Sequence, residues 1–157
     1  AVCAGVAQAD GERAMTAHET YDDQNIYAKI LRGELPSHTV FEDEHTLVIM
    51  DIMPRADGHC LVLPKAPSRN ILDTSEDVLA AVARTTKLMA KTVMNAFGAD
   101  GVTVQQFNET AGGQVVFHLH VHVIPRRNGV QMRPHTGDMA DQDLLAEQAA
   151  KIRAALG

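Results

Sequence analysis

Tryptophan is absent from this sequence, which holds only two tyrosines and four phenylalanines among 157 residues. Its two cysteines, Cys3 and Cys60, are too few and too far apart for a disulfide framework or a metal knuckle. This usage favours a reducing compartment, so we expect a cytoplasmic protein. No apolar run approaches the ~20 residues that a membrane helix needs, and the scattered aromatic residues do not suggest a membrane belt. We therefore expect no membrane association.

Positive charge is also scarce, because 14 Lys and Arg residues stand against 20 Asp and Glu residues, for a formal net charge of −6. A general nucleic-acid binder needs a dense Lys/Arg face for the phosphate backbone, so we expect no nucleic-acid partner. A compact anionic ligand in one local site remains compatible with this balance.

The chain length and its 45% hydrophobic content fit one globular domain with a real core. We expect residues 1–20 to form a mobile N-terminal extension, because the chain from Met15 opens on polar residues. Residues 21–157 are then predicted to form a single domain with a C-terminal tail helix.

Hydrophobic periodicity predicts a short helix over 25–33, a long helix between Ser75 and Gly98, and a terminal helix over 141–156. The apolar stripe predicted for the long helix consists of Leu79, Val82, Ala83, Thr86, Met89, Val93 and Phe97. The predicted strands span residues 39–43, 46–51, 58–64, 101–107 and 115–124. Strands grouped around segregated helices indicate an α+β fold with an antiparallel sheet of about five strands.

Three histidines, His118, His120 and His122, alternate with apolar residues in the last predicted strand. Alternate residues of a strand face opposite sides, so the three imidazoles are predicted to share one face. A solvent-facing row that happens to be rich in histidine is the structural alternative. The regular alternation favours a functional row.

Metal binding is one possible function for this row, since histidine is a common metal ligand. Same-face residues of a strand lie ~6.6 Å apart, which puts the outer pair ~13 Å apart on a line. Three such side chains do not converge on one ion, although two could bind with a third ligand from elsewhere. Because the next carboxylate after His122 is Asp138, this geometry disfavours a catalytic metal.

Nucleophilic catalysis fits the row better, because a neutral imidazole attacks phosphorus near neutral pH and divides one displacement into two easier steps. The outer imidazoles and Gln114 could then donate hydrogen bonds to phosphate oxygens. The backbone at Gly112 and Gly113 could approach the same charge. A Walker-type loop is absent from the sequence, which excludes a P-loop nucleotide site.

Residues 113–124, Gly-Gln-Val-Val-Phe-His-Leu-His-Val-His-Val-Ile, resemble the signature of the histidine triad (HIT) superfamily of nucleotide hydrolases and transferases. The resemblance extends to residues 25–36, to Asp51-Ile52 and to residues 58–65, and it covers roughly 25–126. It implies a HIT-like antiparallel sheet with helices and a homodimer paired through the long helix and a neighbouring strand.

The resemblance also assigns roles by position in this sequence. His120 would be the nucleophile that attacks the α-phosphorus of a purine nucleotide, supported by His118 and His122. Asp51 would accept the ribose hydroxyls, and His59 would lie near the triad. The residues implied to contact the base, ribose or phosphate are Ile26, Tyr27, Ile30, Asp51, Ile52, Asn108, Gly113, Gln114 and Val115.

The chain departs from the family pattern at the metal site that many bacterial relatives carry. Their Cys-x-x-Cys before the first helix helps to bind a structural zinc, and the matching positions here are Asn25 and Ala28. We therefore expect neither a structural zinc nor a required cofactor.

The sequence leaves the leaving group open among phosphoramidates, dinucleoside polyphosphates and adenylylated amines. A metal-binding module or a nucleotide sensor with little turnover are the alternatives to a hydrolase.

Overall fold

The structure, a computed structural model, describes residues 20–134 and 137–156. The expected mobile extension, apart from Thr20, lies outside the described residues. The elements in chain order are α1 (Ile26–Leu31), β1 (Thr39–Glu42), β2 (Thr46–Met50), β3 (Cys60–Pro64), α2 (Glu76–Phe97), β4 (Gly101–Gln105), the 3₁₀ turn η2 (Thr110–Gly112), β5 (Val121–Arg126) and α3 (Gln142–Ala155).

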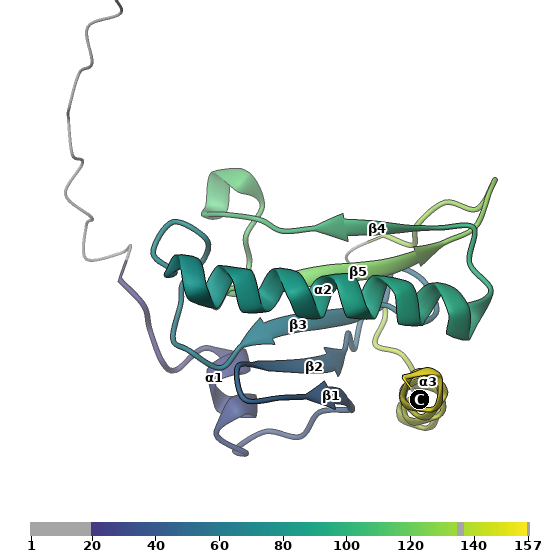
Figure 1. Ribbon diagram of the computed structural model, residues 1–157, viewed down its shortest axis with the longest axis horizontal. Coiled ribbons are helices and arrows are strands. Elements are labelled where there is room, and N and C mark those ends of the chain that lie inside the picture. Colours follow the sequence, from purple (N-terminus) through teal and green to yellow (C-terminus); the bar gives the residue numbers. More distant parts are fainter. Residues whose placement is uncertain (1–19, 135–136, 157) are drawn as a thin grey trace, which may run out of the picture.

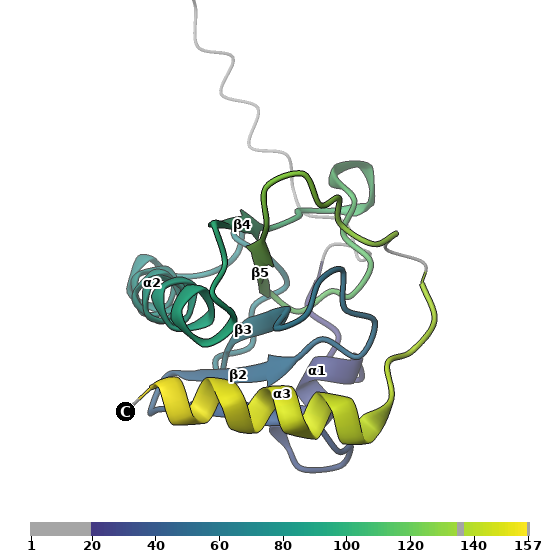
Figure 2. The ribbon, with the colours of Figure 1, turned by 90° about the vertical axis from the view of Figure 1, so that its right-hand side faces the viewer.

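The strands form one sheet in the order β1-β2-β3-β5-β4, and every neighbouring pair is antiparallel. The helix α2 lies across this sheet (Figure 1). Figure 2 shows α1 on the opposite side of β3 from α2, with α3 running beside the sheet. The predicted α+β class with an antiparallel sheet, a short first helix, a long helix and a terminal helix is confirmed.

Both faces of the neighbouring strands β2 and β3 are buried, because their residues are almost all apolar and successive side chains point to opposite faces. Val48 and Val62 belong to the cluster that packs against α2 and α3. Ile49 and Leu61 belong to a second cluster, closed by side chains of α1. The short helix α1 is therefore attached to the sheet face opposite to α2.

The long helix α2 begins and ends where the sequence predicts. Ser75 caps its first turn by accepting a hydrogen bond from the Val78 N–H, and Gly98 ends it in the left-handed conformation with φ +56°.

The predicted apolar stripe of α2 is partly wrong. The buried residues are Ala81, Val82, Thr85, Met89, Thr92 and Val93, whereas Leu79 and Ala83 are exposed. Thr85 and Thr92 are buried although the predicted stripe omits them. Burial is possible because both hydroxyls are hydrogen-bonded, Thr85 to the Thr46 hydroxyl at 2.8 Å and Thr92 to the Leu88 carbonyl at 2.8 Å.

The strand predicted over 115–124 is also partly wrong, because β5 begins only at Val121 and continues to Arg126. Residues 115–120 instead lie beside the loop at 68–70. The Leu119 N–H donates a hydrogen bond to the Ser68 carbonyl there, at 2.8 Å. Pro125 is tolerated inside β5 because β3 pairs only with residues 121–123, so its missing N–H breaks no ladder on that side.

None of the helices in the described part of the chain is long and apolar enough to cross a membrane.

Candidate active site

The three triad histidines do not form the straight row that the strand pattern predicts. His118 and His120 lie in the irregular segment before β5, and only His122 lies within the strand. The rings of His120 and His122 meet at 5.1 Å between centroids and both line one pocket. His118 is fully buried and does not line that pocket. His118 and His120 both pack against the Tyr27 ring, at 6.5 and 4.9 Å between centroids, so the imidazoles share one side although only His120 and His122 reach the pocket.

His118 is enclosed by two hydrogen-bond partners that fix its protonation. Its Nε2 lies 2.9 Å from the Pro64 carbonyl oxygen, which can only accept, so Nε2 carries the proton. Its Nδ1 then accepts from the Tyr21 hydroxyl at 2.7 Å. Burial lowers the pKa of His118 to about 4, so the ring is neutral at physiological pH.

The carbonyl group of His118 determines the tautomer of His120. It accepts a hydrogen bond from Nδ1 of His120 at 2.7 Å, so Nδ1 carries the proton of that ring. In the neutral ring the lone pair is then on Nε2. The ring of Tyr27 packs against His120 edge-on at 4.9 Å between centroids, which holds the imidazole in place.

His122 has the opposite tautomer, because the loop between β2 and β3 fixes its neighbour His59. The backbone N–H of Arg55 donates to Nδ1 of His59 at 3.0 Å, so neutral His59 carries its proton on Nε2. That Nε2 lies 2.9 Å from Nδ1 of His122, which must therefore accept. His122 is left with its proton on Nε2, as a hydrogen-bond donor.

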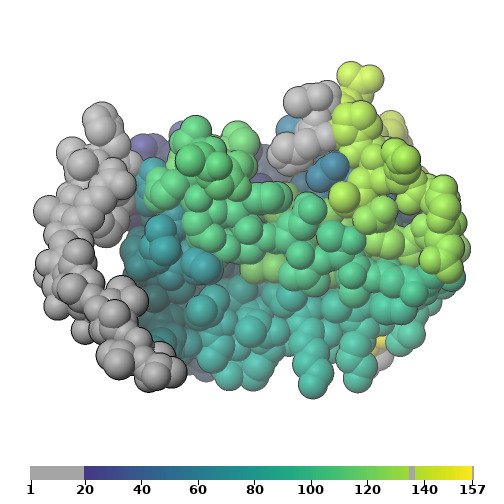
Figure 3. Space-filling view, turned by 90° about the horizontal axis from the view of Figure 1, so that it is seen from above, coloured from purple at the N-terminus to yellow at the C-terminus, as the bar shows by residue number. Residues whose placement is uncertain are grey.

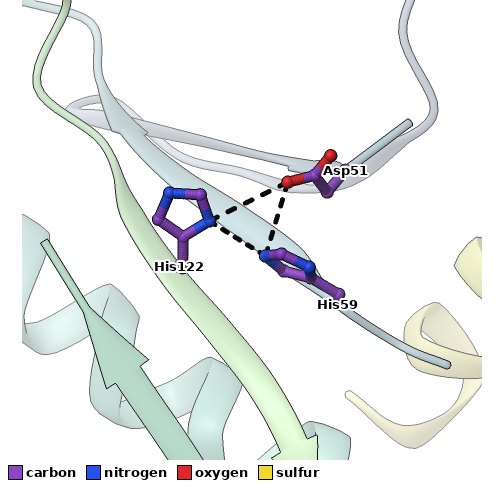
Figure 4. A group of neighbouring side chains, drawn as sticks. All are labelled: Asp51, His59 and His122. Atoms are coloured by element: carbon purple, nitrogen blue, oxygen red, sulfur yellow. Dashed lines mark hydrogen bonds and ion pairs between the residues drawn. The ribbon is translucent and has the colours of Figure 1, made fainter. Parts of the chain in front are cut away.

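Asp51 completes this group, as Figure 4 shows. Its Oδ2 lies 3.4 Å from Nε2 of His59 and 3.8 Å from Nδ1 of His122, and its Oδ1 accepts from the Met53 N–H at 2.9 Å. The expected position of His59 beside the triad matches this arrangement. The loop between β2 and β3 that carries His59 passes close to Phe97 at Gly58. Only glycine fits there, because a Cβ would lie 2.5 Å from the Phe97 ring.

The pocket beside His120 and His122 has a volume of about 290 Å³ and mainly apolar walls. The sequence-predicted residues that line it are Ile26, Tyr27, Ile30, Asp51, Ile52, Gly113, Val115, His120 and His122. Phe107 also lines it and contacts His122 at 5.7 Å between ring centroids. Helix α1, the end of β2 and the segment at 113–122 thus meet at one cavity.

Two predicted phosphate contacts, Asn108 and Gln114, lie outside the lining of this pocket. Gln114 is buried and crosslinks the loops, since its amide donates to the Arg69 and Val116 carbonyls and accepts from the Glu109 N–H. Asn108 accepts from the Ile71 N–H at 3.1 Å. In this arrangement both side chains shape the loop that carries Gly113.

The nitrogens of His59 and His122 and a carboxylate oxygen of Asp51 lie within 4.8 Å of one another, close enough to share a metal ion. The Arg55 N–H argues against such an ion. A metal-bound histidine normally donates through its other nitrogen, whereas Nδ1 of His59 accepts, so its Nε2 keeps a proton instead of a metal. The donor set fits a proton network better than a metal site.

Sequence reasoning missed Tyr21 as a partner of the triad. Tyr21 and His118 are 97 positions apart in the sequence. A single tyrosine before a helix is not part of any sequence pattern that would predict this contact. The role of Arg55 was also missed because it acts through its backbone.

Comparison with known proteins shows which proteins the chain is similar to. Residues 32–129 match the model of the HIT domain family. Adenylylsulfatase HINT3 from Arabidopsis thaliana is 33% identical over 125 residues, which are 80% of this chain and 62% of that protein, so the chain spans under two thirds of its length. Adenosine 5'-monophosphoramidase HNT1 from Saccharomyces cerevisiae is 33% identical over 114 residues, 73% of this chain and 70% of that protein.

A solved structure shares the whole fold. The crystal structure of a Hit-like protein from Bartonella henselae is 49% identical and superposes with a TM-score of 0.83, covering 86% of this chain and 98% of that one. Together with the family match over residues 32–129, this shows that the chain belongs to the HIT family.

Proposed function

We propose that this protein is a nucleotidyl hydrolase that cleaves at the α-phosphate of purine nucleotides through a covalent nucleotidyl-histidine intermediate on His120. The observation that carries the proposal is the contrast of tautomers in the pocket. His120 presents a lone pair on Nε2, whereas His122 presents an Nε2–H. A nucleophile and a hydrogen-bond donor thus stand side by side, 5.1 Å apart between ring centroids.

In the first step Nε2 of His120 attacks the α-phosphorus, an N–P bond forms, and the bond from phosphorus to the leaving group breaks. The leaving group departs with the electron pair and takes a proton from water, while the Nε2–H of His122 donates a hydrogen bond to a phosphate oxygen. The cationic imidazole of His120 keeps its Nδ1–H on the His118 carbonyl, which offsets the new charge.

In the second step a water molecule attacks the phosphorus and loses a proton to solvent, the N–P electron pair returns to Nε2 of His120, and a nucleoside monophosphate is released. Cys60 offers no competing nucleophile, because it is fully buried and burial raises the pKa of its thiol to about 12.

The walls of the pocket support a nucleoside as the group held there. Ile26, Ile30 and Ile52 would form an apolar slot for the base, and the Asp51 carboxylate in the same lining would accept the ribose hydroxyls. The names of two relatives, an adenylylsulfatase and an adenosine 5'-monophosphoramidase, favour hydrolysis at an adenosine 5'-phosphate. We extend that substrate class to this chain.

We also propose that the reaction needs no metal ion. The chain lacks the Cys-x-x-Cys of the zinc-binding relatives, and Nε2 of His59 carries a proton instead of a metal. The alternative, a metal-binding module, would need that proton to leave against the Arg55 N–H.

A homodimer is a further part of the proposal. Leu88 on α2 and Val104 on β4 are 40% and 48% exposed, and both would be covered if the two elements paired with those of a second copy. Figure 3 shows α2 and the segment after residue 100 side by side on one face of the molecule. Size-exclusion chromatography with light scattering on the chain and on Leu88→Glu tests this part.

Hydrolysis of an adenosine phosphoramidate in the presence of a chelator tests the function. The proposal predicts turnover by the unaltered protein and a loss of about 10⁴-fold or more in His120→Ala, by analogy with other covalent catalysts. His45→Ala serves as the matched control, because His45 is exposed on the turn between β1 and β2. Equal activity in His120→Ala, or activity that a chelator abolishes, would contradict the proposal.

A further inference from the structure

A second hollow of about 490 Å³ lies on the other side of the loop that joins β2 to β3, and it shares no lining residue with the nucleotide pocket. Its walls come from residues 55–57, the end of α2, the end of β5 with the segment after it, and α3. Those elements turn toward the viewer in Figure 2. We refer to it as the basic hollow.

The charge of this hollow opposes that of the whole chain. The cationic residues that line it are Arg55, Arg126, Arg127, Arg133 and Lys151, and the acidic ones are only Asp57 and Glu147. The chain as a whole carries a formal net charge of −6. Like charges gathered in one concave surface repel one another and raise the local potential for an anion.

Neutral backbone acceptors hold the arginines in place. Nε of Arg55 donates to the Arg133 carbonyl at 3.0 Å, and the guanidinium of Arg127 donates to the carbonyls of Phe97 and Gly98 at the end of α2. Arg126 donates to the Thr103 hydroxyl at 3.1 Å. These contacts fix the side chains without cancelling their charge, so little side-chain entropy is lost when a ligand binds.

Carboxylates compensate little of this charge. Arg133 pairs with Asp57 at 2.7 Å, whereas Arg55, Arg126, Arg127 and Lys151 form no ion pair within the part of the chain that the structure describes. The hydrogen bond from Arg133, with a further contribution from the Arg127 charge, lowers the pKa of Asp57. The ammonium group of Lys151 lies 4.9 Å above the Phe97 ring centroid, at the wall of the hollow.

We propose that the basic hollow is a binding site for a compact polyphosphate group, separate from the nucleotide pocket. Guanidinium forks match phosphate oxygens in pairs and lysine adds a point charge, a combination that suits several adjacent phosphates better than a single carboxylate. The hollow is large enough for a chain of three phosphates. This inference does not depend on the reaction proposed for His120.

Isothermal titration of the full chain with inorganic tripolyphosphate tests the site. One-site binding that weakens with added salt is expected for the unaltered protein. Arg127→Gln and Lys151→Gln should each lower the affinity about tenfold, which is about 1.4 kcal/mol, because each removes one charged donor to the phosphates. The double change Arg84→Gln with Lys87→Gln is the control, because both residues lie exposed on α2 outside the hollow.

Lys151 makes no hydrogen bond to other described side chains, so its variant keeps the test valid if Arg127→Gln unfolds. A parallel titration with ATP distinguishes a nucleoside triphosphate from a free polyphosphate. The ligand of the basic hollow is the one of the two that binds more tightly and loses affinity in both variants. Absence of binding, unchanged affinity in both variants, or an equal loss in the α2 control would overturn the proposal.

Discussion

His118 and His122 stand symmetrically about His120 in the sequence, yet their surroundings in the fold are unlike. His118 is enclosed between Tyr21 and the Pro64 carbonyl, outside the pocket beside His120 and His122. His122 lines the pocket and is linked through His59 to the Arg55 backbone. The outer histidines therefore have different positions, since the carbonyl group of one accepts a hydrogen bond from the His120 ring and the side chain of the other lines the pocket.

The largest effect expected from this contrast concerns the side chain of His122. His122→Ala removes the Nε2–H donor from the phosphate, so we expect kcat to fall by about 10²–10³-fold, the usual loss for one donor to developing charge. Steady-state kinetics with an adenosine phosphoramidate measures it. A change in KM alone would show that His122 only binds the ground state.

Acid should reveal the surroundings of His118. Burial lowers its pKa to about 4 from the ordinary value of 6.5, so the unfolded chain binds a proton more readily than the folded one. Stability is then fully present above about pH 6.5 and falls by up to roughly 3 kcal/mol as the pH drops through 4.

Urea unfolding at pH 7 and pH 4.5 measures this loss. His118→Asn should reduce the difference between the two pH values, whereas His45→Asn on the exposed turn should leave it unchanged. An unaltered pH dependence in His118→Asn would assign the acid sensitivity to other groups.

Substitution of His59 separates tautomer control from simple packing. His59→Leu removes the donor to His122, so kcat should fall by about 10–100-fold, as for other residues that orient a functional histidine. His59→Gln can still accept from the Arg55 N–H and donate to His122, and should recover most of the rate. Equal rates in both variants, at equal melting temperatures, would argue against tautomer control.

Removal of the Tyr21 hydroxyl should have the smallest effect. Tyr21→Phe keeps the ring beside His118, 5.7 Å away between centroids, and deletes only the hydrogen bond. We expect a loss of up to about tenfold in kcat with KM unchanged, because one neutral hydrogen bond contributes about 1 kcal/mol. Tyr21→Ala, which also removes the ring, should cost more. A rise in KM instead would place Tyr21 in substrate binding.

Much of the fold was predictable because it follows local rules. The α+β class, the five strands and the limits of α2 follow from alternation, a Ser cap and a Gly stop. The start of β5 was not predictable, because the side chain of Gln114 and the Leu119 N–H tie the preceding segment to a loop 45 to 51 residues earlier. In that segment apolar and polar residues still alternate as in a strand, but the backbone is not paired with a neighbouring strand.

The candidate site shows the same division. The sequence and its family resemblance indicated His120, Asp51 and the apolar slot, because motif residues carry those signals. They did not indicate the tautomers, which depend on backbone groups at Arg55, Pro64 and His118 that any residue supplies.

The most direct test of the account is the intact mass of the protein after brief mixing with an adenosine phosphoramidate. The account predicts the transient addition of one adenylyl group, located on His120 by peptide mapping, and its absence in His120→Ala. Turnover without any adduct, or an adduct on another residue, would contradict covalent catalysis by His120.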